Sequence, residues 1–151
     1  MSSPHFSSSD FAGVASRLAA VLPEKLVHKN VLESASQTKN ETDFSTQRHH
    51  LVRIVDLPSK VMSMTIGGLE PGQSSRLHRH NYETLIYILE GTGKSRIGDK
   101  EVAWVKGDAV YVPVWAWHQH TNLSTAERAL YLACENAPHL QNLGIALREE
   151  A

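Results

Sequence analysis

Short runs of apolar residues, many of them alternating with polar ones, occupy the chain from about residue 51 onward. They are mostly rich in β-branched and aromatic residues and are separated by glycine, proline or aspartate. The runs are LVRIVDL (51–57), KVMSMTI (60–66), TLIYILE (84–90), KSRIG (94–98), EVAWV (101–105), AVYVP (109–113) and RALYLACE (128–135). Such runs are typical of the strands of a sandwich or barrel. The pattern therefore predicts an all-β domain.

The N-terminal part follows a helical pattern instead. Apolar residues recur at helical spacing between Phe11 and Leu22, Asp10 is suited to cap the start of a helix, and Pro23 ends the run. Residues Glu24 to Glu33 favour a second short helix. We therefore expect short helices before the strands.

The segment SASQTKNETDFSTQ (34–47) is polar and predicts a loop. After it, the apolar period changes to that of strands. We therefore expect an N-terminal helical and loop segment, residues 1–45, followed by a β domain, residues 46–151, which includes a C-terminal tail.

Length and charge limit the partners that the chain can have. A chain of 151 residues has the usual size of one domain and can bury a sizeable core. Its 15 basic and 16 acidic residues give a net charge of −1, which provides no electrostatic footprint for nucleic acid or an anionic membrane. We therefore expect a small-molecule substrate, with no nucleic acid and no membrane as partners.

Two features concern the cellular compartment. The chain has one cysteine, Cys134, which excludes an intramolecular disulfide and suits a reducing cytoplasm. The N-terminal run FAGVASRLAAVL is too short to span a bilayer and carries Arg17 in its middle, so neither a membrane helix nor a secretory signal is expected. The expected location is cytoplasmic.

Three histidines form the main candidate site. His78 and His80 stand two residues apart in RLHRHNYE, and His118 lies in PVWAWHQHTN. Residues i and i+2 of a strand point to the same face, so His78 and His80 can bind one ion together. A third ligand must come from another strand, and His118 is the candidate. The three residues predict a metal site inside a small β-barrel.

Glycine, proline and asparagine residues accompany these histidines at defined spacing. The positions are Gly72, His78, His80 and Gly91 in a first unit and Gly107, Pro113, His118 and Asn122 in a second, with fifteen residues between the units. Over roughly residues 60–135 this arrangement resembles the two motifs of the cupin superfamily. The resemblance implies a jelly-roll β-barrel, with the short N-terminal helices in front of it.

The chain departs from the cupin pattern in two places. Thr84 stands where the first unit usually has an acidic ligand. Glu83 lies one residue earlier, where strand alternation turns it away from the ion unless a turn or bulge re-aims it. In the second unit, Trp115 replaces the glycine that usually follows two residues after the proline.

Both departures resemble the gentisate 1,2-dioxygenases. The similar features are HRH without a following acidic ligand, a strand like YILEGTG, and the order proline, tryptophan, tryptophan, histidine in PVWAWHQHTN. Enzymes of that family bind iron through histidines alone. The resemblance therefore implies an Fe(II)-dependent dioxygenase that acts on a small aromatic or hydroxy acid.

The expected cofactor is a divalent metal ion, first of all Fe(II), with Zn, Ni or Mn as alternatives because imidazole suits several ions. Three imidazoles on one face would leave the opposite positions open for substrate and dioxygen. Without a carboxylate ligand the ion keeps its full charge, which favours an anionic, chelating substrate such as a hydroxylated aromatic acid. We also expect a homodimer.

Two further residues share the strand parity of the proposed ligands. His120 would be a supporting hydrogen-bond donor or a proton-transfer group, or else an ordinary lining residue of the barrel. Arg76 would clamp a substrate carboxylate, or else lie at a solvated mouth. By contrast, His49 and His50 would point to opposite faces of an extended segment, so neither is predicted to be a ligand.

Two other function classes stay open at the level of sequence. The chain may be read as a non-catalytic small-molecule-binding cupin, in which case Thr84 marks a lost ligand. A non-oxidative metal enzyme, such as an isomerase or lyase, is also compatible with the motifs, because one fold hosts many functions.

Overall fold

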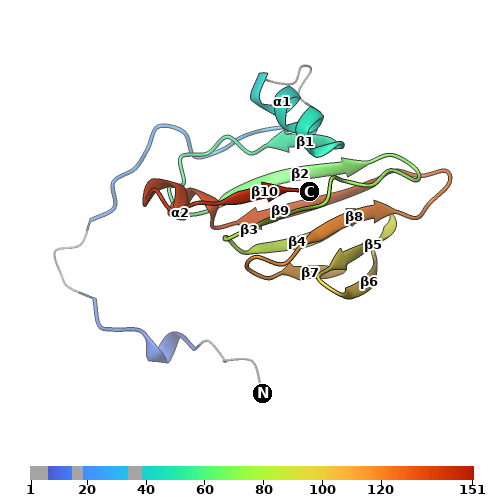
Figure 1. Cartoon of the computed structure of the whole chain (residues 1–151). Helices are drawn as coiled ribbons and strands as arrows, with labels where there is room; N and C mark the ends of the chain where they lie inside the picture. The colour runs from blue at the N-terminus through green and yellow to red at the C-terminus, as the bar shows by residue number, and fades with distance from the viewer. Residues whose placement is uncertain (1–6, 15–18, 34–38) are drawn as a thin grey trace.

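The computed structural model of the chain describes residues 7–14, 19–33 and 39–151. Its strands form two five-stranded antiparallel sheets that pack face to face (Figure 1). In order across the first sheet lie β1 (Leu51–Ile54), β2 (Ser63–Leu69), β9 (Ala129–Glu135), β4 (Thr84–Glu90) and β7 (Ala109–Val112). The second sheet consists of β10 (Arg148–Glu150), β3 (His78–His80), β8 (His118–Asn122), β5 (Thr92–Ile97) and β6 (Lys100–Val105). The predicted all-β fold is confirmed.

Alternation along the strands separates the inner and outer faces. In β4, Thr84, Ile86 and Ile88 are buried whereas Leu85 and Tyr87 are exposed. The same alternation continues in β8, where His118, His120 and Asn122 are buried and the two residues between them are partly exposed. Because successive side chains of a strand point to opposite faces, this period of two places polar histidines on the inner face of the sandwich.

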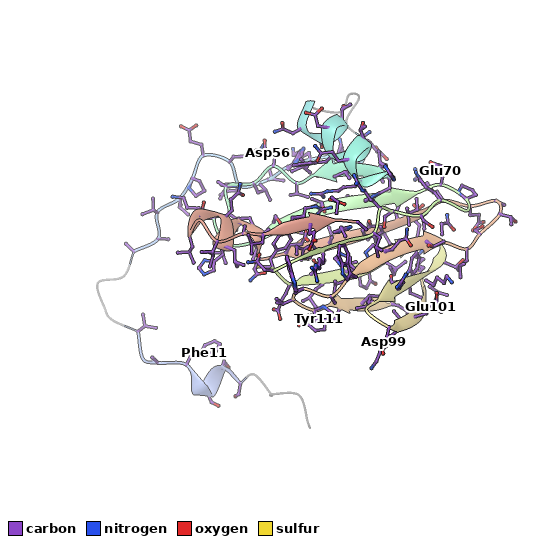
Figure 2. All side chains as sticks on the ribbon, in the orientation of Figure 1. Phe11, Asp56, Glu70, Asp99, Glu101 and Tyr111 are labelled. Atoms are coloured by element: carbon purple, nitrogen blue, oxygen red, sulfur yellow. The ribbon has the colours of Figure 1, made fainter. Side chains whose placement is uncertain are left out.

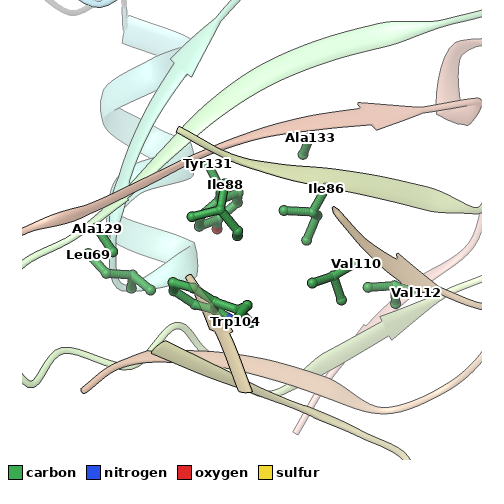
Figure 3. Packing of buried hydrophobic residues seen from close by; sticks show 9 residues of the cluster. All are labelled: Leu69, Ile86, Ile88, Trp104, Val110, Val112, Ala129, Tyr131 and Ala133. Atoms are coloured by element: carbon green, nitrogen blue, oxygen red, sulfur yellow. The ribbon is translucent and has the colours of Figure 1, made fainter. Parts of the chain in front are cut away.

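A hydrophobic cluster fills part of the space between the sheets (Figure 3). Most of its residues come from β4, β7 and β9 of the first sheet, and Trp104 of β6 reaches into it from the second sheet. The cluster consists of Leu69, Ile86, Ile88, Trp104, Val110, Val112, Ala129, Tyr131 and Ala133. Close packing of these side chains supplies the apolar burial that stabilises the sandwich.

The helix predicted between Phe11 and Leu22 is wrong for the residues that the structure describes. Residues 11–14 and 19–22 form no helix, and residues 15–18 lie outside the described part. Phe11 is 72% exposed and Leu22 is 76% exposed, and Figure 2 shows Phe11 far from both sheets. An amphipathic pattern stabilises a short helix only when its apolar face packs against something, and here that contact is missing.

The second predicted helix, Glu24 to Glu33, is also wrong, because this segment is irregular and ends in a turn. It runs beside the residues that follow β1. Lys25 forms an ion pair with Asp56, and the backbone N–H of Asp56 donates to His28 Nδ1 at 2.9 Å. Lys25 and His28 thus attach this irregular segment to the residues that follow β1.

Within the polar segment predicted as a loop, residues from Lys39 to Arg48 form helix α1. The helix lies on edge strand β1 (Figure 1). The backbone N–H of Val52 donates to Ser45 Oγ at 2.9 Å, and that of Ile54 donates to Glu41 Oε1 at 2.8 Å. Polar side chains of α1 therefore occupy the edge of the sheet, a role that local polarity does not reveal.

The C-terminal tail is ordered by pairing with β3. After helix α2 (Ala137–Asn142), β10 runs antiparallel to β3, with Arg148 opposite His80. Ser8–Asp10 form a single turn of 3₁₀ helix near the start of the chain. No helix among the described residues is long and apolar enough to cross a membrane.

Candidate metal centre

The three predicted ligands lie together on the inner face of the second sheet. His78 and His80 come from β3, His118 comes from β8, and the two strands pair with His78 opposite His118. All three side chains are buried, and one ligand nitrogen from each lies within 4.8 Å of the other two. A single ion can therefore contact all three.

Each of the three imidazoles is oriented by a backbone carbonyl two residues away. The hydrogen bonds run from His78 Nδ1 to Arg76 O at 2.9 Å, from His80 Nδ1 to Tyr82 O at 2.8 Å, and from His118 Nδ1 to Ala116 O at 2.9 Å. A carbonyl oxygen can only accept, so each Nδ1 carries the proton. Each Nε2 then presents its lone pair, which is the state that a metal ion requires.

Burial keeps these histidines neutral. Desolvation lowers the pKa of His80 and of His118 from 6.5 to about 4. Desolvation is also the main cause of the lowered pKa of His78, and the nearby His118 lowers it further. Neutral imidazole is the form that binds metal, so the site is ready for an ion at neutral pH. The donor set and its geometry fit a divalent transition metal.

His120 lies beside the three ligands and is held by a buried polar chain. Its Nδ1 is 2.6 Å from Ser95 Oγ, and Trp104 Nε1 donates to the same oxygen at 2.9 Å. Among the described residues the Ser95 hydroxyl has no other acceptor, so we assign its proton to the bond with His120 Nδ1. The proton of His120 is then on Nε2, and this side chain lines the cavity as an N–H donor.

His50 also lines the cavity, although it does not belong to the metal-binding group. Its Nδ1 donates to Arg48 O at 2.9 Å, which leaves Nε2 to accept from the Tyr131 hydroxyl at 2.9 Å. Gly67 makes room for this arrangement, because a Cβ there would lie 2.2 Å from Tyr131 Cζ. This geometry agrees with the prediction that His50 is not a metal ligand. The sequence did not predict that His50 lines the cavity.

Arg76 does not line the cavity. Its Nε lies 3.6 Å from Glu150 Oε2, and its Nη2 donates to Ala151 O at 3.3 Å. Two other arginines, Arg48 of α1 and Arg148 of β10, line the space beside the histidines. The structure thus brings cationic groups to the cavity from segments that carry no recognisable motif.

Two spaces share Arg48, Thr65, Glu135 and Arg148 in their walls, and histidines line the inner one. The inner one measures about 40 Å³, which suits an ion and little more. The outer one measures about 400 Å³ and is lined in part by Phe44, Tyr82 and Leu147. Arg48 and Arg148 line both spaces. Among the polar atoms of the described residues, Arg148 Nη2 is buried without a hydrogen-bond partner, so it can donate to a bound molecule.

Glu83 points away from the cavity, as strand alternation predicted. It is exposed, and its Oε1 accepts a hydrogen bond from the Tyr111 hydroxyl at 2.7 Å. Thr84 is buried and lines the cavity. The Thr84 hydroxyl donates to Glu135 Oε2 at 2.8 Å, and that oxygen lies 3.7 Å from His80 Nε2. A carboxylate is therefore present near the histidines, although motif spacing did not reveal it.

Trp115 takes the place of the glycine that is usual in the second unit. It has a φ of 65°, in the left-handed region where glycine is favoured, and its backbone N–H donates to His80 O at 2.8 Å. The Trp115 and Trp117 rings flank the Arg79 guanidinium, whose carbon lies 4.3 Å and 4.6 Å from their centroids. This stacking offsets part of the backbone strain.

Known proteins share both the sequence and the fold of this region. Residues 66–134 match the cupin domain family Cupin_2. 5-Aminosalicylate 1,2-dioxygenase of Comamonas sp is 34% identical over 83 residues, which are 55% of this chain and 21% of that enzyme. Gentisate 1,2 dioxygenase 1 of Aquipseudomonas alcaligenes is 34% identical over 68 residues, 42% of this chain and 20% of that enzyme. The matched region thus spans about a fifth of these relatives.

One relative that is similar to this chain is not named as a dioxygenase. 1-Methylthio-D-xylulose 5-phosphate methylsulfurylase of Rhodospirillum rubrum is 36% identical over 64 residues, which are 42% of this chain and 40% of that protein. The homologues of this chain are therefore not restricted to dioxygenases.

Solved structures agree with the fold. A salicylate 1,2-dioxygenase variant from Pseudoaminobacter salicylatoxidans superimposes with a TM-score of 0.63 at 16% identity, over 67% of this chain and 31% of that one. A cupin-2 domain from Rhodospirillum rubrum gives 0.54 at 26% identity, over 60% and 61% of the two chains. Residues 66–134 of this chain therefore match a cupin domain and include the buried three-histidine candidate metal site, and the chain is a distant homologue of gentisate and aminosalicylate 1,2-dioxygenases and of other cupins.

Proposed function

We propose that this cupin binds Fe(II) through His78, His80 and His118 and uses dioxygen to cleave a small hydroxylated aromatic acid. The observation that carries the proposal is the convergence of three Nε2 lone pairs, each presented by a carbonyl-bound, neutral imidazole. The names of the relatives from Comamonas and Aquipseudomonas support the choice of reaction.

The outer chamber suits the proposed substrate in size and charge. Its volume of about 400 Å³ is within the range of small-molecule sites. Arg48 and Arg148 line it and can pair with a carboxylate, a role for which Arg76 was considered from sequence. Phe44 and Tyr82 provide aromatic surface for a ring. A hydroxylated aromatic acid would therefore bind with its acid group at the arginines and its ring between the aromatic side chains.

His120 has the second role in the proposal. His120 lines the inner space, so its Nε2 proton would bond to a substrate oxygen that extends from the outer chamber toward the ion. The hydrogen bond to Ser95, which Trp104 also contacts, prevents the ring from turning. Burial lowers the pKa of His120 well below its ordinary value, so it acts as a neutral donor. Bound Fe(II) would supply the redox chemistry with dioxygen, while these residues bind and orient the substrate.

The methylsulfurylase relative supports a second candidate, a metal enzyme that does not consume dioxygen. An isomerase or lyase would use the same ion as a Lewis acid. A non-catalytic binding cupin would use the same chamber without turnover.

One experiment separates these candidates. Protein purified without chelators or a nickel column is analysed for metal, and oxygen uptake is then measured with a panel of hydroxybenzoates and diketones. We expect iron-dependent oxygen uptake with a hydroxylated aromatic acid and none in the His118→Ala variant. Turnover without oxygen uptake would support the isomerase or lyase, and binding without turnover would support the binding module.

A further inference from the structure

The carboxylate of Glu135 occupies the place that the first cupin unit leaves without an acid. Thr84 stands at the position where the acidic ligand is usual, and its Cα partner on the neighbouring strand β9 is Glu135. Paired residues of adjacent strands point to the same face of a sheet. Glu135 therefore faces the cavity together with Thr84, and it lines both the inner space and the outer chamber.

We propose that Glu135 is a fourth protein ligand of the metal ion, supplied by β9 in place of the missing acid of β4. The inference rests on the metal site of the proposed function. The observation behind the inference is that two acceptor atoms, Glu135 Oε2 and His80 Nε2, lie 3.7 Å apart.

No hydrogen bond joins these two atoms. His80 Nδ1 donates to Tyr82 O, so Nε2 carries no proton and presents a lone pair to a carboxylate oxygen. Two acceptors face each other favourably when a cation or a shared donor lies between them, and the three histidines gathered at this point favour a cation. A divalent ion bound to His80 would meet this condition.

The distance requires a small adjustment. Two adjacent ligands that are each about 2.1 Å from one ion lie about 3 Å apart, so Glu135 Oε2 must move less than 1 Å closer to His80 Nε2 and must also approach the other two histidines. Before this movement, Glu135 is not part of the group whose ligand atoms all lie within 4.8 Å of one another. Its backbone is held between β2 and β4, opposite Ser63 and Thr84, so rotation of the side chain supplies the movement.

Thr84 has a positioning role in this arrangement. Its hydroxyl donates to Glu135 Oε2 at 2.8 Å and so holds the carboxylate beside the histidines. The ligand set would carry one negative charge, which reduces the charge of the site. Arg148 is paired with Glu150 at 2.7 Å, so Arg48 and the ion itself would supply the positive charge that an anionic substrate meets.

The test uses Co(II) and the full-length chain, with affinity measured by competition with a chromophoric chelator and coordination followed by the visible absorption of the ion. We expect Glu135→Gln to weaken Co(II) binding by about ten-fold or more and to change the absorption bands. Glu83→Gln is the matched control, because its carboxylate bonds to Tyr111 outside the cavity, and it should alter neither quantity. Adding Thr84→Glu to Glu135→Gln should restore both the Co(II) affinity and the absorption bands.

Each other result overturns the inference. Equal affinity and equal spectra for Glu135→Gln and the unmutated chain would remove the ligand role but leave the three-histidine site intact. Weaker binding with an unchanged spectrum would show that the carboxylate acts through its charge alone. If Glu135→Gln does not fold, Glu135→Asp replaces it, and an unchanged spectrum there counts against the ligand. Absence of Co(II) binding by the unmutated chain would overturn the proposed function as well.

Discussion

Backbone carbonyls decide the chemical state of the metal-site histidines. The acceptors for His78, His80 and His118 belong to the main chain, so they do not depend on the side chains at the accepting positions. A substitution of Arg76 therefore leaves the orientation of His78 intact. The Arg76 side chain, however, shares the carboxylate of Glu150 with Arg148, so it is not an independent control for the arginines that line the cavity.

We predict that Arg148→Lys weakens the binding of an aromatic acid by about 1–3 kcal/mol, the range of charge-assisted hydrogen bonds, because lysine cannot reproduce the planar fork. Binding of an uncharged phenol of similar shape should change little. Arg128→Lys, at a side chain that pairs with exposed Glu90 away from the cavity, should affect neither ligand. Calorimetric titration without oxygen measures all three. Equal affinity of the unmutated protein for acid and phenol would remove the carboxylate site at Arg148.

His50 makes the stability of the metal-free protein dependent on pH. Burial is the main cause that lowers its pKa from 6.5 to about 4 in the folded state. Below pH 6.5, His50 takes up a proton in the unfolded chain but stays neutral in the folded protein. The contribution of His50 to the free energy of unfolding is therefore complete above about pH 6.5 and decreases as the pH falls toward 4. We predict that the free energy of unfolding falls by about 2 kcal/mol less between pH 7 and pH 4.5 in His50→Gln than in the unmutated protein. Urea unfolding at pH 7 and pH 4.5 measures it, and identical losses in both proteins would contradict the prediction.

At the scale of secondary structure, the position of β3 depends on the C-terminal strand. β3 carries His78 and His80, yet it pairs with β8 in register only at His78 and His118. On its other side β10 pairs along the whole of β3. The tail beyond α2 therefore helps to hold two proposed ligands and also brings Arg148 to the chamber.

Asn81 connects the end of β3 to this tail. Its Nδ2 donates to Ile145 O at 2.7 Å, and its Oδ1 accepts from the backbone N–H of Leu147 at 2.8 Å. We predict that Asn81→Ala lowers the free energy of local opening of residues 145–150 by about 1–2 kcal/mol. Hydrogen exchange measures this opening. Asn142→Ala, which removes a single bond to Lys60 O, is the control, and equal exchange in the two variants would contradict the role of Asn81.

At the scale of the whole molecule, the apolar cluster and the metal cavity share the space between the sheets. Ile86, Tyr131 and Ala133 border both, whereas the other residues of the cluster do not line the cavity. The fold therefore has an apolar core that does not include the metal ligands.

We predict that His78→Ala, His80→Ala and His118→Ala each strongly reduce metal retention while the barrel stays folded, because the core does not depend on the ion. Metal analysis after dialysis measures retention, and a cooperative thermal transition of the metal-free variants shows the fold. Full metal content in all three variants would show that the site is assigned wrongly.

The expected homodimer stays a prediction. The outer face of the first sheet exposes Leu85, Tyr87 and Tyr111, and Leu85 is 60% exposed. Apolar surface of this kind is found at interfaces between subunits. Light scattering should give the mass of two chains for the unmutated protein and of one chain for Leu85→Glu. A monomer before substitution would exclude the dimer.

Much of the β domain and of the metal site could be predicted from the sequence. Alternation located most strands within a few residues, and the spacing of His78, His80 and His118 identified three histidines that come together in the fold as a candidate metal site. Parity also placed Glu83 outside the cavity. Each of these inferences uses neighbours in the chain or a motif of defined spacing, so local geometry was sufficient.

The tertiary structure alone decided the rest. Local periodicity favoured helices between Phe11 and Glu33, where the described residues form none, and polarity hid helix α1, which is held by bonds to β1. Glu135 and Arg148 reach the site through pairing with Thr84 and His80, residues far away in the sequence. Strand register determines such encounters, and a slip of one residue would turn each side chain to the opposite face. No local pattern along the chain specifies that register, which is why these residues emerged only from the folded molecule.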